Sequence, residues 1–346
     1  IMAYTTIPKS TDYFNTTLYV GNGSSKTITG IPFAPSLVWI KARSAAENHV
    51  MVDTARGANN YLMPNTTNGN DTNPEFLKSF TSDGYTLGLG DRVNKSSTNL
   101  VSWNWKANGA GSSNTDGSIN TTKTSANTTS GCSIITYTGN ATAGATIGHG
   151  MGIKPSMIII KELAGGNDWI VYTQALTANK ILYLNSTAGE NDNNVFFNDT
   201  EPTTSLITLG SIGATNGSGV AMIAYCFSNV KGFSKQGSYL GNGSTDGTFV
   251  YTGFKPAWIM IKKSSAAGTN WFIFDDKRVG YNPDNDYVSP NTNGAEGSTV
   301  YLDILSNGFK LKANESDVNT NGATYIYMAF AAEPLVSTNG IPSTAR

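Results

Sequence analysis

Cysteine, histidine and charged residues are scarce in this chain of 346 residues. It has two cysteines and two histidines, and charged residues make up 14% of it, against about 25% in a typical soluble protein. Secreted scaffolds stabilised by disulfides carry more cysteines. We therefore expect Cys132 and Cys226 to be buried free thiols, with a bridge between them as the alternative.

Strong charge and long apolar runs are also missing. The net charge of −1 leaves no basic surface for a nucleic-acid backbone. No apolar run approaches the roughly 18 residues that cross a bilayer, so we expect no membrane insertion. No charged segment followed by an apolar stretch opens the sequence, so we expect no secretory signal. Abundant glycine (37 residues), asparagine, serine and threonine indicate short strands joined by turns.

One stretch occurs three times, at residues 35–41, 155–161 and 256–262. It consists of proline, a small residue, four large apolar residues and lysine. An apolar run this short, rich in β-branched and aromatic residues, predicts a buried strand, and proline is tolerated at a strand's first residue. We call these stretches the marker strands. Repetition of this kind predicts three versions of one structural unit.

Each repeat ends on a strongly apolar closing strand, at residues 100–105, 220–227 and 325–330. We expect the marker and closing strands to pair near the centre of a sheet. The spacing of strands and turns predicts an all-β chain of three tandem antiparallel β-sandwich (jelly-roll-like) modules of about 90–110 residues.

The predicted division is a lead-in at 1–18, modules at 19–106, 133–228 and 229–333, a linker or assembly arm at 107–132, and a tail at 334–346. The arm is rich in glycine, serine and threonine and has almost no large apolar residues. Its β-branched residues can add a strand to a neighbouring sheet edge; they are Thr121, Thr122, Thr124, Thr128 and Thr129. A disordered tether is the alternative.

The tryptophans recur at repeat positions. We assign Trp39 and Trp258 to one position of the marker strand, and Trp169 and Trp271 to one position of the following strand. Recurrence favours core packing over stacking against sugars. Trp103 and Trp105 share one face of a closing strand, so we expect them to meet a neighbouring module.

Groups that could carry chemistry are few. His49 and His149 are expected to be surface or turn residues, because no zinc spacing and no nucleophile elbow accompanies them. Several carboxylates cluster in polar loops, and these are Asp192, Asp199, Asp275, Asp276, Asp284 and Asp286. Calcium ligation is one interpretation, but solvated turns are the one we favour. We predict no catalytic, cofactor-binding or metal-binding residues, no cofactor and no enzymatic activity, and we assign no binding residues.

Several motifs resemble repeat proteins of tailed bacteriophages, of the marine and cyanophage type. The resemblance covers essentially the whole chain, and its motifs lie at residues 137–140, 148–155, 224–227, 231–234, 239–243, 306–311 and 325–330. Such proteins are described as tail fibre-like or virion structural proteins. The resemblance brings no catalytic residues with it. The sequence departs from a fibre shaft, because it has neither heptads nor a collagen-like repeat.

The resemblance implies a non-enzymatic structural protein on the surface of a phage virion, tail fibre-like and engaged with host glycans. Its partners would be other virion proteins and further copies of itself, with a trimer as one form. A capsid decoration or collar/tail component without a receptor role is one alternative. A secreted carbohydrate-binding module is another, and a depolymerase would need convergent carboxylates in a groove.

Overall fold

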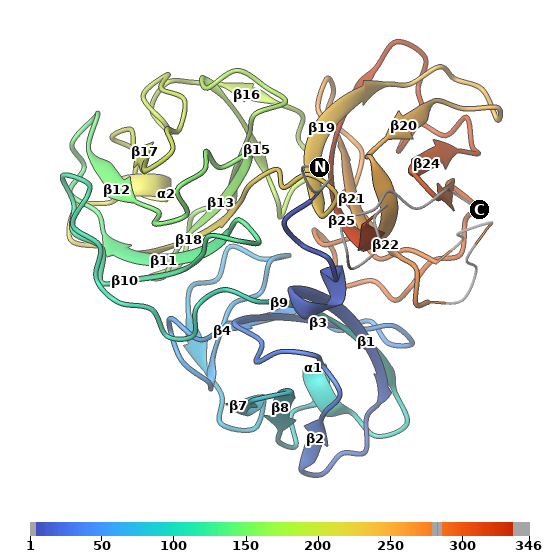
Figure 1. The fold of residues 1–346 in the computed structure, drawn as a ribbon, viewed down its shortest axis with the longest axis horizontal. Helices are drawn as coiled ribbons and strands as arrows, with labels where there is room; N and C mark the ends of the chain where they lie inside the picture. Colours follow the sequence, from blue (N-terminus) through green and yellow to red (C-terminus); the bar gives the residue numbers. More distant parts are fainter. Residues whose placement is uncertain (1–4, 279–281, 283–285, 335–346) are drawn as a thin grey trace.

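The computed structural model describes residues 5–278, 282 and 286–334. These residues form an all-β chain of antiparallel sheets, which confirms the predicted fold class. Three lobes, which we call modules 1, 2 and 3 in chain order, surround a common centre (Figure 1). Within the described part of the chain, no helix is long and apolar enough to cross a membrane.

One strand order recurs in the large sheets of all three modules: opening strand, closing strand, marker strand, second strand. In module 1 these are β1 (Phe14–Val20), β9 (Asn99–Trp105), β3 (Leu37–Ala42) and β4 (Val50–Asp53). In module 2 they are β11 (Cys132–Thr138), β18 (Ala221–Phe227), β13 (Met157–Glu162) and β14 (Ile170–Thr173). In module 3 they are β19 (Ser234–Leu240), β25 (Thr324–Pro334), β21 (Phe254–Lys263) and β22 (Phe272–Asp275). The sheet of module 2 is extended by β10 (Lys123–Asn127) on one side and by β15 (Lys180–Tyr183) and β16 (Asn191–Asp192) on the other.

A smaller sheet packs against each large one. It is formed in module 1 by β2 (Lys26–Ile28), β8 (Gly84–Leu87) and β7 (Leu77–Thr81), in module 2 by β12 (Thr146–Gly148) and β17 (Leu206–Thr208), and in module 3 by β20 (Phe249–Tyr251), β24 (Gly308–Leu311) and β23 (Leu302–Leu305). The remaining elements are the 3-10 helix η1 (Ser10–Asp12), the pair β5 (Asn60–Tyr61) and β6 (Asp71–Thr72), and the one-turn helices α1 (Asp91–Asn94) and α2 (Gly213–Asn216).

The marker strands are buried on both faces. All six residues of β3 are buried; Trp39 faces a core shared by the three modules, whereas Ile40 faces the core of module 1 alone. A strand covered on both sides reads as a continuous apolar run rather than an alternating one. Each marker strand pairs with its closing strand at the centre of the sheet, as predicted.

The shared core fills the centre of the molecule. Trp105 of module 1 contacts Phe227 of module 2 and Trp258 of module 3, with ring centroids 6.0 and 5.7 Å apart. The prediction that this closing strand meets its neighbours is therefore confirmed. The remaining void, about 10 Å³, is at the lower limit for holding even one water molecule. The axis is thus a packed core and not a channel.

One repeat assignment was wrong. Leu37 faces Trp105 across the ladder, and Trp258 faces the equivalent Phe330. Trp258 therefore corresponds to Leu37, while Trp39 corresponds to Met260. The two tryptophans lie two residues apart in register, and both face the shared core, because side chains two apart along a strand point to the same side.

The lead-in and the arm both contribute strands. β1 begins at Phe14, inside the region expected to precede module 1. Within the arm, β10 pairs antiparallel with β11, from Lys123 opposite Thr136 to Asn127 opposite Cys132. The strand addition expected of the arm thus occurs within its own chain. Of the predicted tail, residues 335–346 lie outside the described residues.

The two cysteines are free and buried, as expected. They lie on adjacent strands but on opposite faces, because Cys132 packs into the shared core and Cys226 into the core of module 2. Burial raises the pKa of the Cys132 thiol to about 12, so both packing and protonation state disfavour reaction.

A buried asparagine fastens each opening turn, which the sequence analysis missed. The carboxamides of Asn94, Asn216 and Asn319 accept from the backbone N–H groups of Asn22, Asn140 and Asn242, at 3.0, 2.8 and 2.9 Å. Each amide nitrogen also donates to buried carbonyls, such as those of Gly88, Gly210 and Ala313. The asparagines of the recurrent Gly-Asn dipeptides therefore supply the backbone N–H groups that these buried side chains accept from.

Candidate functional site: a pocket at one of three seams

The modules meet at three equivalent seams. We call the boundary between modules 1 and 2 the first seam, that between 2 and 3 the second, and that between 3 and 1 the third. A backbone hydrogen bond of 2.8 Å crosses each seam at equivalent positions: Asn70 N–H to Leu163, Glu190 N–H to Ser264, and Glu296 N–H to Arg43. The three modules therefore close into a ring.

A buried lysine spans each seam. These lysines end the marker strands, and each donates to a carbonyl of the neighbouring module: Lys161 to Thr67 at 2.8 Å, Lys262 to Thr187 at 3.2 Å, and Lys41 to Asn293 at 3.3 Å. Burial lowers the pKa of all three to about 8. The lysine that ends each of the three repeated stretches therefore lies at a seam between modules and not in solvent.

The expectation that the two histidines are surface or turn residues was wrong about their exposure. Both are completely buried. His49 accepts from the Trp39 indole at its Nδ1 (3.0 Å), and its Nε2 lies 3.1 Å from the Ser289 carbonyl across the third seam. His149 does lie in a loop, between the Met151 N–H and the Thr203 carbonyl. Each imidazole is hydrogen-bonded at both nitrogens, and burial lowers both pKa values, so a neutral ring is stable inside.

Beside each seam, one residue after the second strand occupies an equivalent place. Thr54, Gln174 and Asp276 donate their backbone N–H groups to Ser36, Ser156 and Ala257 of the adjoining marker strand, each at 2.9 Å. Their side chains differ in charge. Asp276, at the third seam, is the acidic one of the three.

At the first and second seams a segment of the chain itself bonds this position, although a hollow of about 480 Å³ lined by Ser36, Thr54 and Gly109 remains beside it at the first. At the first, the arm enters, and the Gly109 carbonyl accepts from Thr54 Oγ1 and from Ser125 Oγ. At the second, the Asn229 carboxamide accepts from the Gln236 N–H at 2.6 Å, and Gln174 donates to the Gln236 carbonyl at 3.3 Å. Segments of the chain itself therefore bond the side chains of Thr54 and Gln174, although the Gln236 side chain at the second seam has no hydrogen-bond partner among the described residues.

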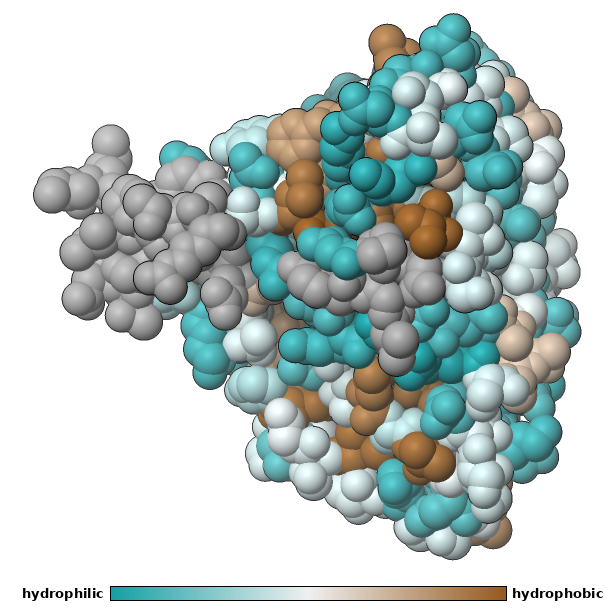
Figure 2. Space-filling view, turned by 90° about the vertical axis from the view of Figure 1, so that its right-hand side faces the viewer, coloured by the Kyte–Doolittle hydropathy of each residue, from teal (hydrophilic) through white to brown (hydrophobic). Residues whose placement is uncertain are grey.

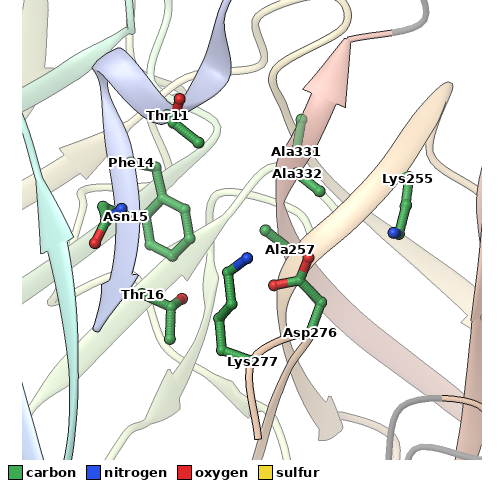
Figure 3. A pocket seen from close by; sticks show the side chains of 10 residues that line it. All are labelled: Thr11, Phe14, Asn15, Thr16, Lys255, Ala257, Asp276, Lys277, Ala331 and Ala332. Carbon is green, nitrogen blue, oxygen red and sulfur yellow. The ribbon is translucent and has the colours of Figure 1, made fainter. Parts of the chain in front are cut away.

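At the third seam Asp276 Oδ1 has no such partner among the described residues, and a pocket of about 240 Å³ lies beside it. Figure 3 shows β1 and η1 on one side and β21, β22 and β25 on the other, with the Lys277 ammonium pointing toward the Asp276 carboxylate. The lining comprises Thr11, Phe14, Asn15, Thr16, Lys255, Ala257, Asp276, Lys277, Ala331 and Ala332. We call this cavity the seam pocket.

Two buried polar atoms of the seam pocket lack a hydrogen-bond partner among the described residues. They are Asp276 Oδ1 and Thr16 Oγ1. Burial raises the pKa of Asp276 to about 6, although Lys277 and Lys255 oppose the shift. Native proteins pair nearly all buried polar atoms, so a cavity that leaves two of them unpaired is suited to a polar ligand.

The other carboxylates named from the sequence are not brought together here. Asp192 and Asp199 are exposed, as expected of solvated carboxylates, although Asp192 lies in the short strand β16 and not in a turn. Asp275 and Asp286 contradict that expectation, because both are buried and paired, with Arg278 at 2.7 Å and Arg43 at 3.5 Å. Asp284 lies outside the described residues. Among those that are described, no three His, Cys, Asp or Glu side chains lie together as metal ligands.

Sequence reasoning treated Asp276 as one half of an Asp-Asp pair in a turn. Aligning the three repeats would have distinguished it, since Thr54 and Gln174 are uncharged at the same position. The cavity itself had no such signature, because residues from four separated segments form it.

Fold and pocket together define a class: three β-sandwich repeats fused into a pseudo-threefold ring with a polar pocket at the third seam. The chain belongs to the family described as a domain of unknown function (DUF7483), which matches residues 9–334. No curated protein and no solved structure matches it.

Proposed function

We propose that this chain is a non-enzymatic structural protein on the surface of a tailed-bacteriophage virion, attached to the particle through its third seam. The observation that carries the proposal is the asymmetry of the ring. At two seams the chain's own segments bond the side chain equivalent to that of Asp276, whereas at the third Asp276 Oδ1 is left unpaired beside a polar pocket. The phage-type repeat motifs supply the virion setting, which stays a resemblance.

Two further features support a structural role. The ring provides, within one chain, the threefold arrangement that a trimeric fibre obtains from three chains. The seam pocket also contains a single carboxyl group, that of Asp276, whereas most glycosidases use two flanking the scissile bond. Lys255 and Lys277 add positive charge, which suits binding of a polar or acidic group better than acid–base hydrolysis.

Locating the protein in purified particles tests this proposal. Antibody against the recombinant chain should label intact virions in immunogold electron microscopy, and its peptides should co-purify with particles through a density gradient. Label on fibres supports the tail fibre-like role, and label on the head or collar supports a decoration role. Absence of the chain from purified particles would show that the proposal is wrong.

Host glycan recognition is a second candidate, favoured by a hollow on module 3. Tyr251 is 53% exposed, and Lys235 lies 5.2 Å from its ring centroid. The hollow, about 510 Å³, also includes Asn229, Ser234 and Thr252. An exposed aromatic ring beside amide and hydroxyl groups is an arrangement that binds sugars. On the face in Figure 2, hydrophobic residues form small groups separated by polar ones, so that face shows no large apolar patch.

A glycan array separates the two candidates. If module 3 binds sugars, Tyr251→Ala should abolish the array response, while Tyr251→Phe should retain it because the stacking ring remains. Equal binding by both variants, or no binding by the wild type, would leave attachment as the supported role.

A further inference from the structure

The edge of one opening strand in this chain is already covered by an added strand. β10 pairs with β11 of module 2 over five residues, with Ser125 opposite Ile134. The Thr122 N–H donates to the Thr136 carbonyl at 2.7 Å, so the backbone groups of Thr136 point away from β18. Because these directions alternate along a strand, those of Ile134 point the same way.

β1 is the counterpart of β11 in module 1, but it is the edge strand of its sheet. Phe14 faces Trp105 as Cys132 faces the equivalent Phe227, so Thr16 and Leu18 correspond to Ile134 and Thr136. Their backbone groups therefore point outward. Thr16 and Phe14 line the seam pocket, and Leu18 and Val20 are 39% and 51% exposed further along the strand.

The third opening strand, β19, has no such free edge at the equivalent residue. Asn229 and Gln174 bond the backbone groups of Gln236, the counterpart of Thr16. Thr248 donates to the Leu240 carbonyl near the end of the same strand. At the equivalent residue, the backbone groups of β11 and β19 therefore have partners in the described structure, whereas Thr16 of β1 lines the seam pocket.

We propose that β1 and the seam pocket form a docking site for an extended segment of a different protein chain, which adds to β1 as an antiparallel strand. The segment would resemble β10 in chemistry, with a hydroxyl- or amide-bearing residue opposite Thr16 that reaches Asp276 Oδ1. Strand addition supplies affinity through backbone hydrogen bonds, and the pocket selects the side chain.

A separate chain is the fitting occupant because the arm of every copy is already engaged. Ser125 and Asn127 of the arm bond Gly109 and Ala107 within the same molecule. The inference uses only the geometry of the isolated protein. It can therefore fail while the virion assignment holds, and the reverse is equally true.

A peptide that copies residues 121–129 is a direct probe. Labelled at its end, it should bind the intact protein saturably with one-to-one stoichiometry in fluorescence anisotropy. Leu18→Pro should weaken binding at least tenfold, because it removes an outward N–H that would bond the added strand. The fold should tolerate the change, because proline is accepted on an edge strand where the N–H faces solvent. Leu18→Ala, which keeps the N–H, should change binding less than threefold. Asp276→Asn should weaken it severalfold.

Ser238→Pro is the matched control, since it makes the same change at the equivalent position of β19. It should leave binding unchanged, and melting curves establish that each variant is folded. A photo-crosslinker in place of the residue that copies Ser125 should label residues 11–18 or 276–277. Labelling of 132–138 alone would mean arm exchange, and dimers in light scattering would mean self-association. Either result, equal effects of the two prolines, or no binding at millimolar peptide would overturn the proposal.

Discussion

The Trp103 indole N–H donates to the Asp275 carboxylate at 3.0 Å, and this bond joins module 1 to module 3. Tyr225 makes the equivalent bond to Asp53 between modules 2 and 1, at 2.8 Å. Each aspartate also pairs with an arginine three residues later, Arg278 or Arg56. Two of the three seams thus bury an Asp–Arg ion pair with an aromatic donor, which is the Trp103 indole at the third seam and the Tyr225 hydroxyl at the first.

The second seam carries a different set at the same repeat positions. Strand register places Thr173, Leu176 and Met328 where the first seam has Asp53, Arg56 and Tyr225. All three members of the polar set are replaced together. Leaving one buried charge without its partner costs several kcal/mol, which explains why the set changes as a unit.

This relationship predicts the effect of exchanging the sets. Asp53→Thr alone should destabilise the protein by about 3–5 kcal/mol, because it leaves the Arg56 guanidinium buried without a counter-charge. The triple variant Asp53→Thr, Arg56→Leu, Tyr225→Met should recover most of that loss. Denaturant unfolding measures both. A triple variant less stable than the single one would show that the three residues do not act as a unit.

Replacing the Asp276 carboxylate by a neutral side chain should stabilise the folded protein at neutral pH. Its folded pKa, about 6, lies above the ordinary value of 3.8, so the stability it contributes is present below pH 4 and is lost as pH rises to 6. Asp276→Asn should therefore stabilise by about 2 kcal/mol at pH 7 and have little effect at pH 4. Asp275→Asn, one residue away, should destabilise at pH 7, because it removes the partner of Arg278. A loss of stability in both variants at pH 7 would contradict this assignment.

The seam lysines should matter more than surface ones. Lys161→Met leaves the Thr67 and Asn167 carbonyls without the ammonium that lies 2.8 and 2.6 Å from them, and we expect a loss of about 2–3 kcal/mol. Lys154→Met is the control, since Lys154 forms an exposed ion pair with Glu201 and should cost less than about 1 kcal/mol. Chemical denaturation at pH 7 compares the two variants. Similar losses would show that the seam lysine contributes no more to stability than a surface lysine.

Stability should rise between pH 7.5 and 9.5. The folded pKa of Lys41, Lys161 and Lys262 is about 8, below the ordinary 10.5, so the unfolded chain binds more protons in this range. The increase should be roughly 1 kcal/mol per pH unit for each lysine. Above pH 10 it should reverse, because burial raises the pKa of folded tyrosines such as Tyr225. Lys161→Met should remove about a third of the rise, and a flat profile would refute the cause.

Local patterns were enough to predict the strands of this protein and their repetition. Proline, apolar residues and lysine at fixed spacing indicated the marker strands, since burial on both faces requires a continuous apolar run. The prediction that Trp103 and Trp105 meet a neighbour followed from side-chain alternation. Composition alone also indicated free cysteines.

Other features depend on contacts between residues far apart in the chain. His49 is buried because Trp39 and Ser289 bond its two nitrogens, and no local pattern reveals such a partner 240 residues away. The composition of the arm indicated strand addition, but it did not indicate that β11 is the strand with which the arm pairs.

The sequence by itself determined three sandwich-forming repeats, because strand formation depends on short-range alternation and turns. Only the tertiary structure decided that they close into one ring, that the marker lysines bind the neighbouring module, and that the pocket lies at the third seam. Closure places residues from η1, β1, β21, β25 and the turn after β22 together. At the equivalent position the arm reaches Thr54 at the first seam, because the folded chain carries Gly109 there, whereas the third seam has the acidic Asp276 beside a cavity.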